Sequence, residues 1–397
     1  MWKTVELQEI IEGLYDGPHA TPKESDSGAI FLGIKNISED GRLDLSDIRY
    51  IALDDMAKWT KRVTPRHKDI VFSYEATLHR YARIPENFVG CLGRRIALVR
   101  IDETKCNGDF LFTYFLSSVW RKEVEKYILP GATVDRIPLT TVPNFKLTIP
   151  PLPIQKKIAG VLSAYDDLIE ANLKRIKLLE EMAQITYEEW FVRHRFPNHE
   201  TTPINPETGL PEGWAPKVLN DFFPIKTGKK DANIQTADGM YPFFTCSQGV
   251  YRCDVYSFDA EAIILAGNGE FNVKYYRGKF EAYQRNYILI PNNRDYLFLL
   301  FLFIKHFLGR ITAGSKGSVI KYLTKDMIAD TKFIEPSGIV LGEFNKIAFP
   351  VFYQIENLEK QNQYLREARD LLLPRLMTGL IDIDDYLSRN GSAAVAA

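Results

Sequence analysis

Residues 153–190 read PIQKKIAGVLSAYDDLIEANLKRIKLLEEMAQITYEEW, and this stretch decides the architecture. No proline follows Pro153 until Pro197, and proline is well tolerated in the first turn of a helix. A row of residues, apolar except at two positions, recurs in steps of four and three: Ile158, Leu162, Tyr165, Ile169, Asn172, Ile176, Leu179, Ala183, Thr186 and Trp190. This spacing is the heptad seam of a long helix that packs along a partner helix.

A second, less regular seam lies near the end of the chain. Shifted by 189 positions, the same row reads Ile347, Val351, Gln354, Leu358, Gln361, Leu365, Ala368 and Leu372. Pro350 and Pro374 should interrupt or end this helix, because proline removes a backbone donor and crowds the preceding turn. We therefore expect two long helices, the second of them broken.

The segments outside the helices form an internal repeat. Residues 2–10 (WKTVELQEI) match 214–222 (WAPKVLNDF), and Gly17 falls opposite Gly228. Three further pairs follow in the same order: 69–73 with 262–266, 94–99 with 285–290, and 110–116 with 296–302. The common order of these pairs makes chance a poor explanation.

The repeat predicts the domain organisation. We expect two similar globular domains, 1–149 and 211–335, with helical segments at 150–196 and 336–380, a linker at 197–210 and a tail at 381–397. Each domain mixes short β-type runs with one apolar helix, so the class is α+β. The two helices should form an antiparallel coiled coil in a pseudo-twofold molecule.

Composition is that of an ordinary globular protein. Of 397 residues 45% are hydrophobic and 25% charged, and 50 Lys and Arg face 51 Asp and Glu. The apolar run 296–304 is far shorter than the ~20 residues of a membrane-spanning helix, so no membrane partner is expected. Cys91, Cys106, Cys246 and Cys253 show no metal-ligand spacing and favour free thiols in the cytoplasm.

The long helix suggests a ligand with two separated half-sites. Residues 154–190 would span roughly 55 Å at 1.5 Å per residue. Duplex DNA has a turn of ~35 Å, so two domains at the ends of such a helix pair could read inverted half-sites. A coiled-coil scaffold without any role in nucleic-acid binding is the alternative that heptads alone also allow.

Two stretches resemble a known family. Residues 150–167 (PPLPIQKKIAGVLSAYDD), continuing to 189–191 (EWF), resemble the first conserved helical region of DNA specificity subunits of type I restriction-modification systems. Residues 365–379 (LREARDLLLPRLMTG) resemble the second region and are the more specific of the two. Residues 337–344 (SGIVLGEF) depart from the family pattern where the first helix has Pro-Leu-Pro-Ile-Gln. Docking at the start of the second helix should therefore differ from the usual pattern.

The resemblance implies a non-catalytic DNA-binding subunit. Each globular domain would be a target-recognition domain that reads half of a split DNA site, while the helix pair sets the spacing. The implied partners are double-stranded DNA, two methyltransferase subunits and a motor-nuclease subunit, which would carry out adenine methylation and restriction. No cofactor is implied for this chain.

The motifs of the corresponding chemistry are absent from the sequence. There is no Asn-Pro-Pro-aromatic motif, no Gly-x-Gly-x-x-Gly loop and no Gly-x-x-x-x-Gly-Lys-Ser/Thr loop. The six histidines include no pair four residues apart that would suit a metal on a helix. A self-contained restriction-modification enzyme is therefore disfavoured.

Cations and amides in loops are the candidates for DNA contact, because phosphates bind cations while base edges need forked or bidentate groups. In the first domain these are Lys35, Asn36, His79, Arg80, Arg83 and Arg136. In the second domain they are Lys226, Lys229, Lys230, Asn268, Lys274, Arg285, Ser315 and Lys316. Structural roles compete with these assignments: Lys229 and Lys230 could lie in a solvated turn, and Arg94 and Arg285, at one repeat position, could make a shared ion pair.

Asn172 and Gln361 occupy the same position of the two seams. A polar residue in an apolar seam usually fixes register at a cost in stability. We expect this pair to hold the helices in register and so to fix the half-site spacing, although two exposed polar residues are the alternative.

The nearly neutral net charge of the chain is unevenly distributed among its segments. Residues 1–149 carry 21 basic and 21 acidic residues, 201–335 carry 16 and 14, 150–200 carry 7 and 8, and 336–397 carry 6 and 8. The second domain is thus mildly basic and both helical segments are mildly acidic. We expect weak DNA binding by the chain alone, with much of the phosphate affinity supplied by partner subunits.

Overall fold

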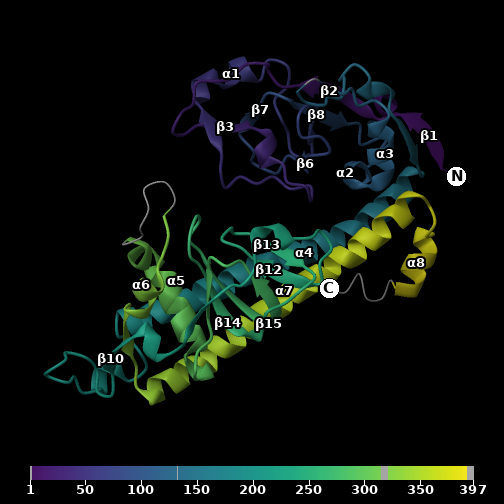
Figure 1. Cartoon of the computed structure of the whole chain (residues 1–397). Helices are drawn as coiled ribbons and strands as arrows, with labels where there is room; N and C mark the ends of the chain where they lie inside the picture. Colours follow the sequence, from purple (N-terminus) through teal and green to yellow (C-terminus); the bar gives the residue numbers. More distant parts are fainter. Residues whose placement is uncertain (1, 132, 314–320, 391–397) are drawn as a thin grey trace. The chain divides into compact units, whose positions relative to one another are not determined.

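A computed structural model describes residues 2–131, 133–313 and 321–390 (Figure 1). The chain divides into two compact units, and each combines one globular domain with one half of the helix pair. Unit 1 comprises Met1–Ala171 with Gln361–Ala397, and unit 2 comprises Asn172–Lys360. The units are described separately below.

The described residues of the globular domain in unit 1 form three small sheets and the short helices α1 to α3. Strands β1 (Lys3–Glu6) and β9 (Lys146–Ile149) pair antiparallel. A four-stranded sheet has the order β2 (Ile11–Asp16), β8 (Ile96–Ile101), β5 (Ile70–Ser73), β6 (Tyr81–Arg83). A three-stranded sheet has the order β4 (Arg49–Ile51), β3 (Ala29–Leu32), β7 (Gly90–Leu92). The helices are α1 (Met56–Trp59), α2 (Gly108–Leu116) and α3 (Ser118–Glu125).

Unit 2 repeats this plan with one larger sheet. Strands β10 (Ala215–Val218) and β17 (Lys332–Glu335) pair as β1 and β9 do. A six-stranded sheet has the order β11 (Ile225–Thr227), β16 (Asn286–Leu289), β14 (Phe258–Ala266), β15 (Val273–Ala282), β12 (Tyr241–Phe244), β13 (Val250–Cys253). The helices are α5 (Leu297–Ala313) and α6 (Lys325–Ala329).

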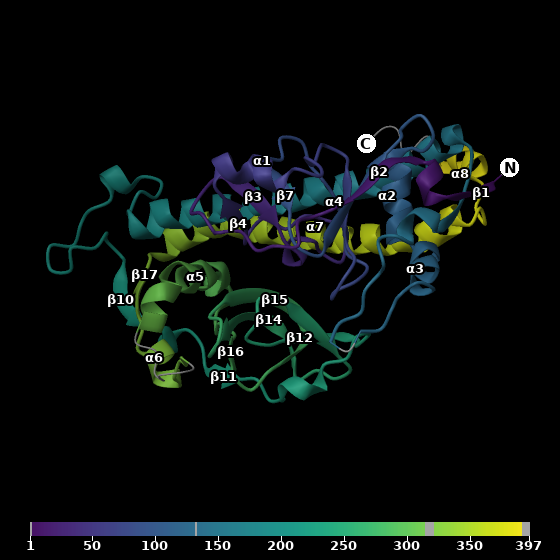
Figure 2. The ribbon, with the colours of Figure 1, turned by 90° about the horizontal axis from the view of Figure 1, so that it is seen from above.

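Two long helices, α4 (Leu152–Tyr187) and α7 (Gly338–Met377), run antiparallel and side by side (Figures 1 and 2). In unit 1, Arg369 Nη1 lies 2.6 Å from Asp166 Oδ1, and Ile158 shares a core cluster with Leu376. In unit 2, Ala183 and Tyr187 share a cluster with Phe352 and Ile355. The predicted α+β class and antiparallel helix pair are confirmed.

The expected break in the second helix is wrong. Helix α7 continues through Pro350, whose side chain is exposed, while Ala348 and Val351 on either side are buried. One lost backbone hydrogen bond is outweighed there by packing of the apolar seam. Helix α4 instead ends in a π-helical turn, Glu188–Val192.

Part of the predicted tail is folded. Helix α8 (Ile383–Asn390) packs on unit 1, where Ile383 is 3% exposed and belongs to the core cluster. Lys157 on α4 pairs with Asp384 on α8. Residues 381–390 therefore complete the first unit.

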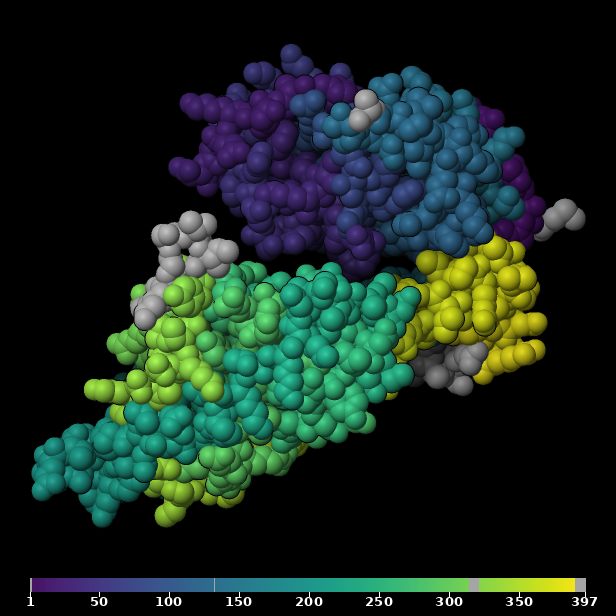
Figure 3. All heavy atoms as spheres, viewed as in Figure 1, coloured from purple at the N-terminus to yellow at the C-terminus, as the bar shows by residue number. Residues whose placement is uncertain are grey.

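The linker after α4 makes a projection from unit 2, visible as the teal protrusion in Figure 3. Its base is anchored, because Phe196 is 2% exposed and its ring lies 5.3 Å from that of Trp214. Its outer part is a turn in which the Asn205 amide donates to Leu210 O at 2.8 Å. The linker is thus a short ordered connection.

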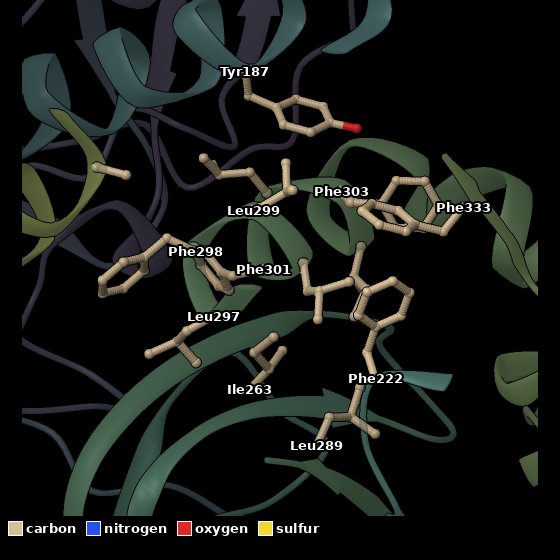
Figure 4. Close-up of a cluster of buried hydrophobic side chains, with 14 of the residues drawn as sticks. Tyr187, Phe222, Ile263, Leu289, Leu297, Phe298, Leu299, Phe301, Phe303 and Phe333 are labelled. Atoms are coloured by element: carbon tan, nitrogen blue, oxygen red, sulfur yellow. The ribbon is translucent and has the colours of Figure 1, made fainter. Parts of the chain in front are cut away.

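The core of unit 2 is built around α5, whose residues from Leu297 to Ile304 are all buried. Figure 4 shows their side chains between Ile263 and Leu289 of the sheet and Tyr187 of α4. Segment Arg294–Ala313 is the one described helix long and apolar enough to cross a membrane, which the short run 296–304 did not predict. Half of its apolar window is buried in the protein, as in a core helix.

The internal repeat extends to individual hydrogen bonds. Ser73 pairs with Ile96 in unit 1, and Ala266 pairs with Asn286 in unit 2. The Gly17 amide donates to Ile96 O at 2.9 Å, as the Gly228 amide donates to Asn286 O at 3.0 Å.

Glycine is required at both of these turns. A Cβ at Gly17 would lie 2.3 Å from Gly93 O, and one at Gly228 would lie 2.2 Å from Tyr283 O. The predicted equivalence of Arg94 and Arg285 in the repeat is shifted by one residue. Ile96 and Asn286 hold the same register position in the two units, so Arg95 is the equivalent of Arg285.

Candidate nucleic-acid interface

Loops at one end of the unit 2 sheet gather into a cluster that we call loop cluster 2. It comprises residues 227–231, 245–249, 267–272, 283–285 and 321–323. Backbone hydrogen bonds join the loops: Gln284 N donates to Lys230 O at 2.9 Å, Gly267 N to Arg285 O at 2.9 Å, and Leu323 N to Gly267 O at 2.8 Å. The Asn272 side chain also donates to Cys246 O at 3.0 Å. Segments far apart in the sequence thus form one surface.

Loop cluster 2 presents cations that are available to a ligand. Lys230, Arg285 and Lys321 are exposed and have no side-chain ion pair among the residues that the structure describes. Lys229 is also exposed, with its Nζ 5.9 Å from the centre of the Phe258 ring. Lys226, on β11 just before the cluster, is exposed as well. Such cations suit phosphate contacts.

Lys274 and Asn268, by contrast, help to hold the cluster together. Lys274 Nζ donates to Ser247 O at 2.7 Å and pairs with Asn272 Oδ1. Burial lowers the pKa of Lys274. Asn268 makes a backbone bridge to Tyr322 and is half-buried. We assign Lys274 a structural role, because its Nζ donates to two protein oxygens.

Cys246 lies at the centre of this framework. Its Sγ donates to Asn286 Oδ1 at 3.2 Å, and burial raises the pKa of the thiol. Asn286 is itself fully buried and donates to Phe244 O at 2.8 Å. These contacts fix the turn that carries Arg285.

The equivalent loops of unit 1 comprise residues 16–19, 74–80, 93–95, 129–131 and 133–137, and together with Arg62, which pairs with Asp16, they form loop cluster 1. Tyr74 N donates to Arg95 O at 3.2 Å and Ile137 N donates to Tyr74 O at 2.7 Å. Glu75 bridges Arg136 through the backbone, as Asn268 bridges Tyr322 in unit 2. The same scaffold therefore presents a loop surface in each repeat.

The cations of loop cluster 1 are mostly neutralised within the unit. Arg62 pairs with Asp16, Arg95 Nε lies 2.9 Å from Glu75 Oε1, and Arg80 Nη2 lies 2.6 Å from Glu39 Oε1. Arg94 and Arg136 are exposed, and no ion pair engages them in the described part of the chain. Among the residues with a described structure, two cations remain available here, against four in loop cluster 2.

Three candidates of the first domain have internal roles. Asn36 is 2% exposed; its Oδ1 accepts from Gly33 N, and its Nδ2 donates to Asp44 O and Asp47 O, each at 3.0 Å. Lys35 Nζ lies 2.5 Å from Asp47 Oδ2. The expectation that Asn36 reads a base does not fit this geometry, because its amide is already used inside the fold.

Arg83 is the third of these candidates. It pairs with Asp109 on α2, and its guanidinium lies 4.7 Å from the centre of the Phe112 ring. These contacts fix β6 against α2 and hold the guanidinium within the unit.

His79 belongs to loop cluster 1 in an unusual conformation. Its φ is 60°, in the left-handed region, and its Nδ1 is buried with no hydrogen-bond partner among the described residues. Burial and then the nearby Arg121 lower the pKa of His79. The side chain is therefore held neutral beside the loop surface.

The remaining candidates divide as follows. Ser315 and Lys316 lie outside the described residues. Asn172 is 5% exposed, as a seam residue should be, but Gln361 is exposed and its neighbour Asn362 is 2% exposed. The assignment of Gln361 to the seam is wrong by one residue.

Several residues of the loop clusters escaped the sequence analysis. Lys321 and Tyr322 come three and four positions after Ser318, at the end of the Gly-Ser stretch 314–318, which was the one sequence signal for them. The ion pairs of Asp16 and Glu75 had no sequence signal, because their partners lie 46 and 20 positions away. No group of three or more His, Cys, Asp or Glu that could hold a metal ion occurs among residues 2–131, 133–313 and 321–390.

Comparison with known proteins identifies the family to which the chain is similar. Residues 1–181 and 211–363 match the family described as type I restriction modification DNA specificity domain. The EcoDI specificity subunit of Escherichia coli is 34% identical over 189 residues, covering 47% of this chain and 42% of that protein. The chain thus spans less than half the length of this relative.

Two other comparisons cover nearly the whole chain. The putative MjaX specificity subunit of Methanocaldococcus jannaschii is 24% identical over 412 residues, covering 96% of this chain and 94% of that protein. The crystal structure of the S subunit of a type I restriction-modification system from M. genitalium has a TM-score of 0.56 at 14% identity, covering 95% of this chain and 96% of that one. This structural likeness shows the fold. Because the family match includes both repeats, the chain belongs to the family of type I restriction-modification DNA specificity subunits.

Proposed function

We propose that the chain reads a bipartite DNA target, one half-site with each loop cluster. The observation that carries this proposal is that two surfaces of exposed cations occur at equivalent strand ends of the two repeats. Lys230 and Arg285 supply such cations in unit 2, and Arg94 and Arg136 supply them in unit 1. Phosphate contacts would position each unit, and loop side chains would read base edges.

The helix pair would set the spacing between the half-sites. Asn172 on α4 and Asn362 on α7 are the buried polar residues that replace the originally expected pair. A buried amide in an apolar seam opposes slippage, because a shifted register would leave it without partners. Replacing both residues with Leu should preserve folding and broaden the range of accepted spacer lengths.

Two methyltransferase subunits and a motor-nuclease subunit would complete the complex and supply the chemistry. An exposed apolar stripe on α4 supports a helical partner: Leu178, Met182 and Ile185 are 64%, 42% and 60% exposed and follow steps of four and three. On α7, Tyr364 and Leu371 are 65% and 62% exposed. Exposed apolar rows on helices are typical of protein interfaces.

We place the complex in the cytoplasm. All four cysteines are free thiols, which suits a reducing compartment.

The formal charge of −1 favours weak DNA binding by the isolated chain, with added affinity from the partner subunits.

The deciding experiment maps methylated adenines in DNA exposed to the assembled methyltransferase complex. A target split into two defined parts by an unspecified spacer is the expected result. A continuous target would contradict the reading of one half-site by each repeat. Salt titration of DNA binding by the same complex should show a steep loss of affinity, whereas no binding at any salt concentration would favour a scaffold.

A further inference from the structure

Two grooves lie at equivalent places in the repeats, apart from the loop clusters. The groove of unit 2 encloses about 1160 Å³ between the end of α4, helices α5 and α6 and the strand pair β10 and β17. Its apolar lining, which we call the floor, includes Phe307, Ile311, Met327 and Ile334. Tyr187, Phe303 and Phe333, which also line it, are seen in Figure 4.

The groove of unit 1 encloses about 640 Å³ between α2, α3, β9 and the end of α7. Lys146 and Thr148 on β9 line it, as Lys332 and Ile334 on β17 line the groove of unit 2. Leu380, 79% exposed, follows α7 and lines this groove, and half-buried Phe191, which follows α4, lines the groove of unit 2. The first residue and the third residue of β9 and of β17 thus lie beside a groove in each repeat, as does the segment after each long helix, and such recurrence is expected of a surface that binds a partner twice.

Both grooves have cationic rims. Lys217, Lys332 and Arg310 border the groove of unit 2, and Lys122, Lys146 and Arg375 border that of unit 1. No ion pair engages these six side chains among the described residues; Arg310 lies 5.4 Å from the centre of the Phe307 ring.

The carboxylate that lines each groove is already engaged. Asp221 Oδ2 accepts from Val218 N at 3.2 Å. Glu123 accepts from Lys146 N at 3.1 Å and also pairs with Lys126. The charge left for a ligand is positive in both grooves.

We infer that each groove binds an acidic, amphipathic segment of the methyltransferase subunit, one copy per groove. The inference rests on the proposed function and names where that partner docks. A peptide with apolar side chains on one face and carboxylates on its edges matches an apolar floor with a cationic rim. Nucleic acid fits less well, because the aromatic side chains Tyr187, Phe303 and Phe333 in the lining are only 2%, 6% and 3% exposed and present little ring face for base stacking.

Charge reversal on the rim tests the inference. In the full chain, Lys217→Glu with Lys332→Glu should weaken binding of the purified methyltransferase subunit of the same system at least tenfold. The matched control, Lys279→Glu with Lys305→Glu, changes the charge equally at exposed positions of unit 2 outside the groove and should stay within twofold. Equal binding by the groove variant and the control would overturn the inference.

Stoichiometry gives a second readout. With Lys122→Glu and Lys146→Glu in unit 1 alone, native mass spectrometry should show one methyltransferase subunit per chain, against two for the wild-type chain. Thermal unfolding midpoints near that of the wild-type chain would show that the variants fold. Two bound subunits at the same affinity would overturn the assignment of the unit 1 groove.

A photo-crosslinking side chain placed at Ile334 identifies the occupant directly. In the assembled complex it should join to an acidic segment of the methyltransferase subunit. Crosslinks to DNA, or to a second copy of this chain, would overturn the inference. The two proposals fail separately: a wild-type chain that directs no split-site methylation contradicts the proposed function, whereas groove variants that assemble normally contradict only the docking site.

Discussion

The two loop clusters share a scaffold and differ in how their charges are used. In unit 1, Arg62, Arg80 and Arg95 each face a carboxylate of the same unit. In unit 2, Lys230 and Arg285 face solvent. A paired cation must leave its carboxylate before it can bind a phosphate, and this exchange reduces the net gain. We therefore expect unit 2 to contribute most of the salt-dependent affinity.

The largest effect should follow from removing the cations of loop cluster 2. Lys229→Ala, Lys230→Ala and Arg285→Ala together should weaken DNA binding by the assembled complex about 100-fold and lower the salt slope by about 2 to 3, since each phosphate contact contributes about 0.9. Fluorescence anisotropy at several salt concentrations measures both quantities. Lys279→Ala, Lys305→Ala and Lys325→Ala form the control, and equal losses in the two variants would remove the distinction between the clusters.

Freeing the paired cations of loop cluster 1 should strengthen DNA binding. Asp16→Asn with Glu75→Gln leaves Arg62 and Arg95 without their carboxylates. We expect DNA binding to tighten about tenfold and the salt slope to rise by about 1 to 2, because two more cations can release counterions. The same titration tests this, and weaker binding would show that the carboxylates read bases.

Removing the available cations of loop cluster 1 should cost less. Arg94→Ala with Arg136→Ala eliminates two exposed cations, and we expect a loss of about three- to tenfold. Lys58→Ala with Lys61→Ala, at exposed positions of the same unit, is the matched control. A loss as large as that of the triple variant of unit 2 would contradict the unequal division.

The smallest effect concerns pH and loop cluster 1. Burial lowers the pKa of His79 from 6.5, so between that value and the lowered pKa the unfolded chain binds more protons than the folded one. Stability of unit 1 should therefore fall as pH drops below about 6.5. His79→Asn, which tolerates the left-handed backbone, should reduce the drop in thermal midpoint between pH 7.5 and 5.5. An unchanged drop would show that His79 does not titrate with folding.

The periodic elements could be predicted from sequence because their signal is local. The steps of four and three predicted α4, and the run 296–302 predicted the buried start of α5. The repeat predicted which strands correspond, since Gly17 and Gly228 meet the same steric requirement. The continuity of α7 through Pro350 was missed, because tertiary packing on both sides of the proline decides it.

The loop clusters were harder to predict because side-chain availability is not a local property. Loop position alone singled out both Lys230, which is exposed, and Lys274, whose Nζ is used by Ser247 and Asn272. Asn36 looked like a base reader until its amide proved to be used by three backbone groups. The seam residue in α7 was misplaced by one position because the repeat offset of 189 was carried across α7 unchanged, whereas Asn362 is the buried residue.

Unit 1 is built from two segments that lie far apart in the sequence, and this has a consequence for its synthesis. Its core includes Leu376, Met377 and Ile383, which leave the ribosome roughly 200 residues after Ala171. At about 5 to 20 residues per second this delay is on the order of 10 to 40 s. Unit 2 is contiguous and can close during that time, so the domain made first is the last to be finished. A premature stop near the end of the message would therefore damage the first recognition domain and leave the second intact.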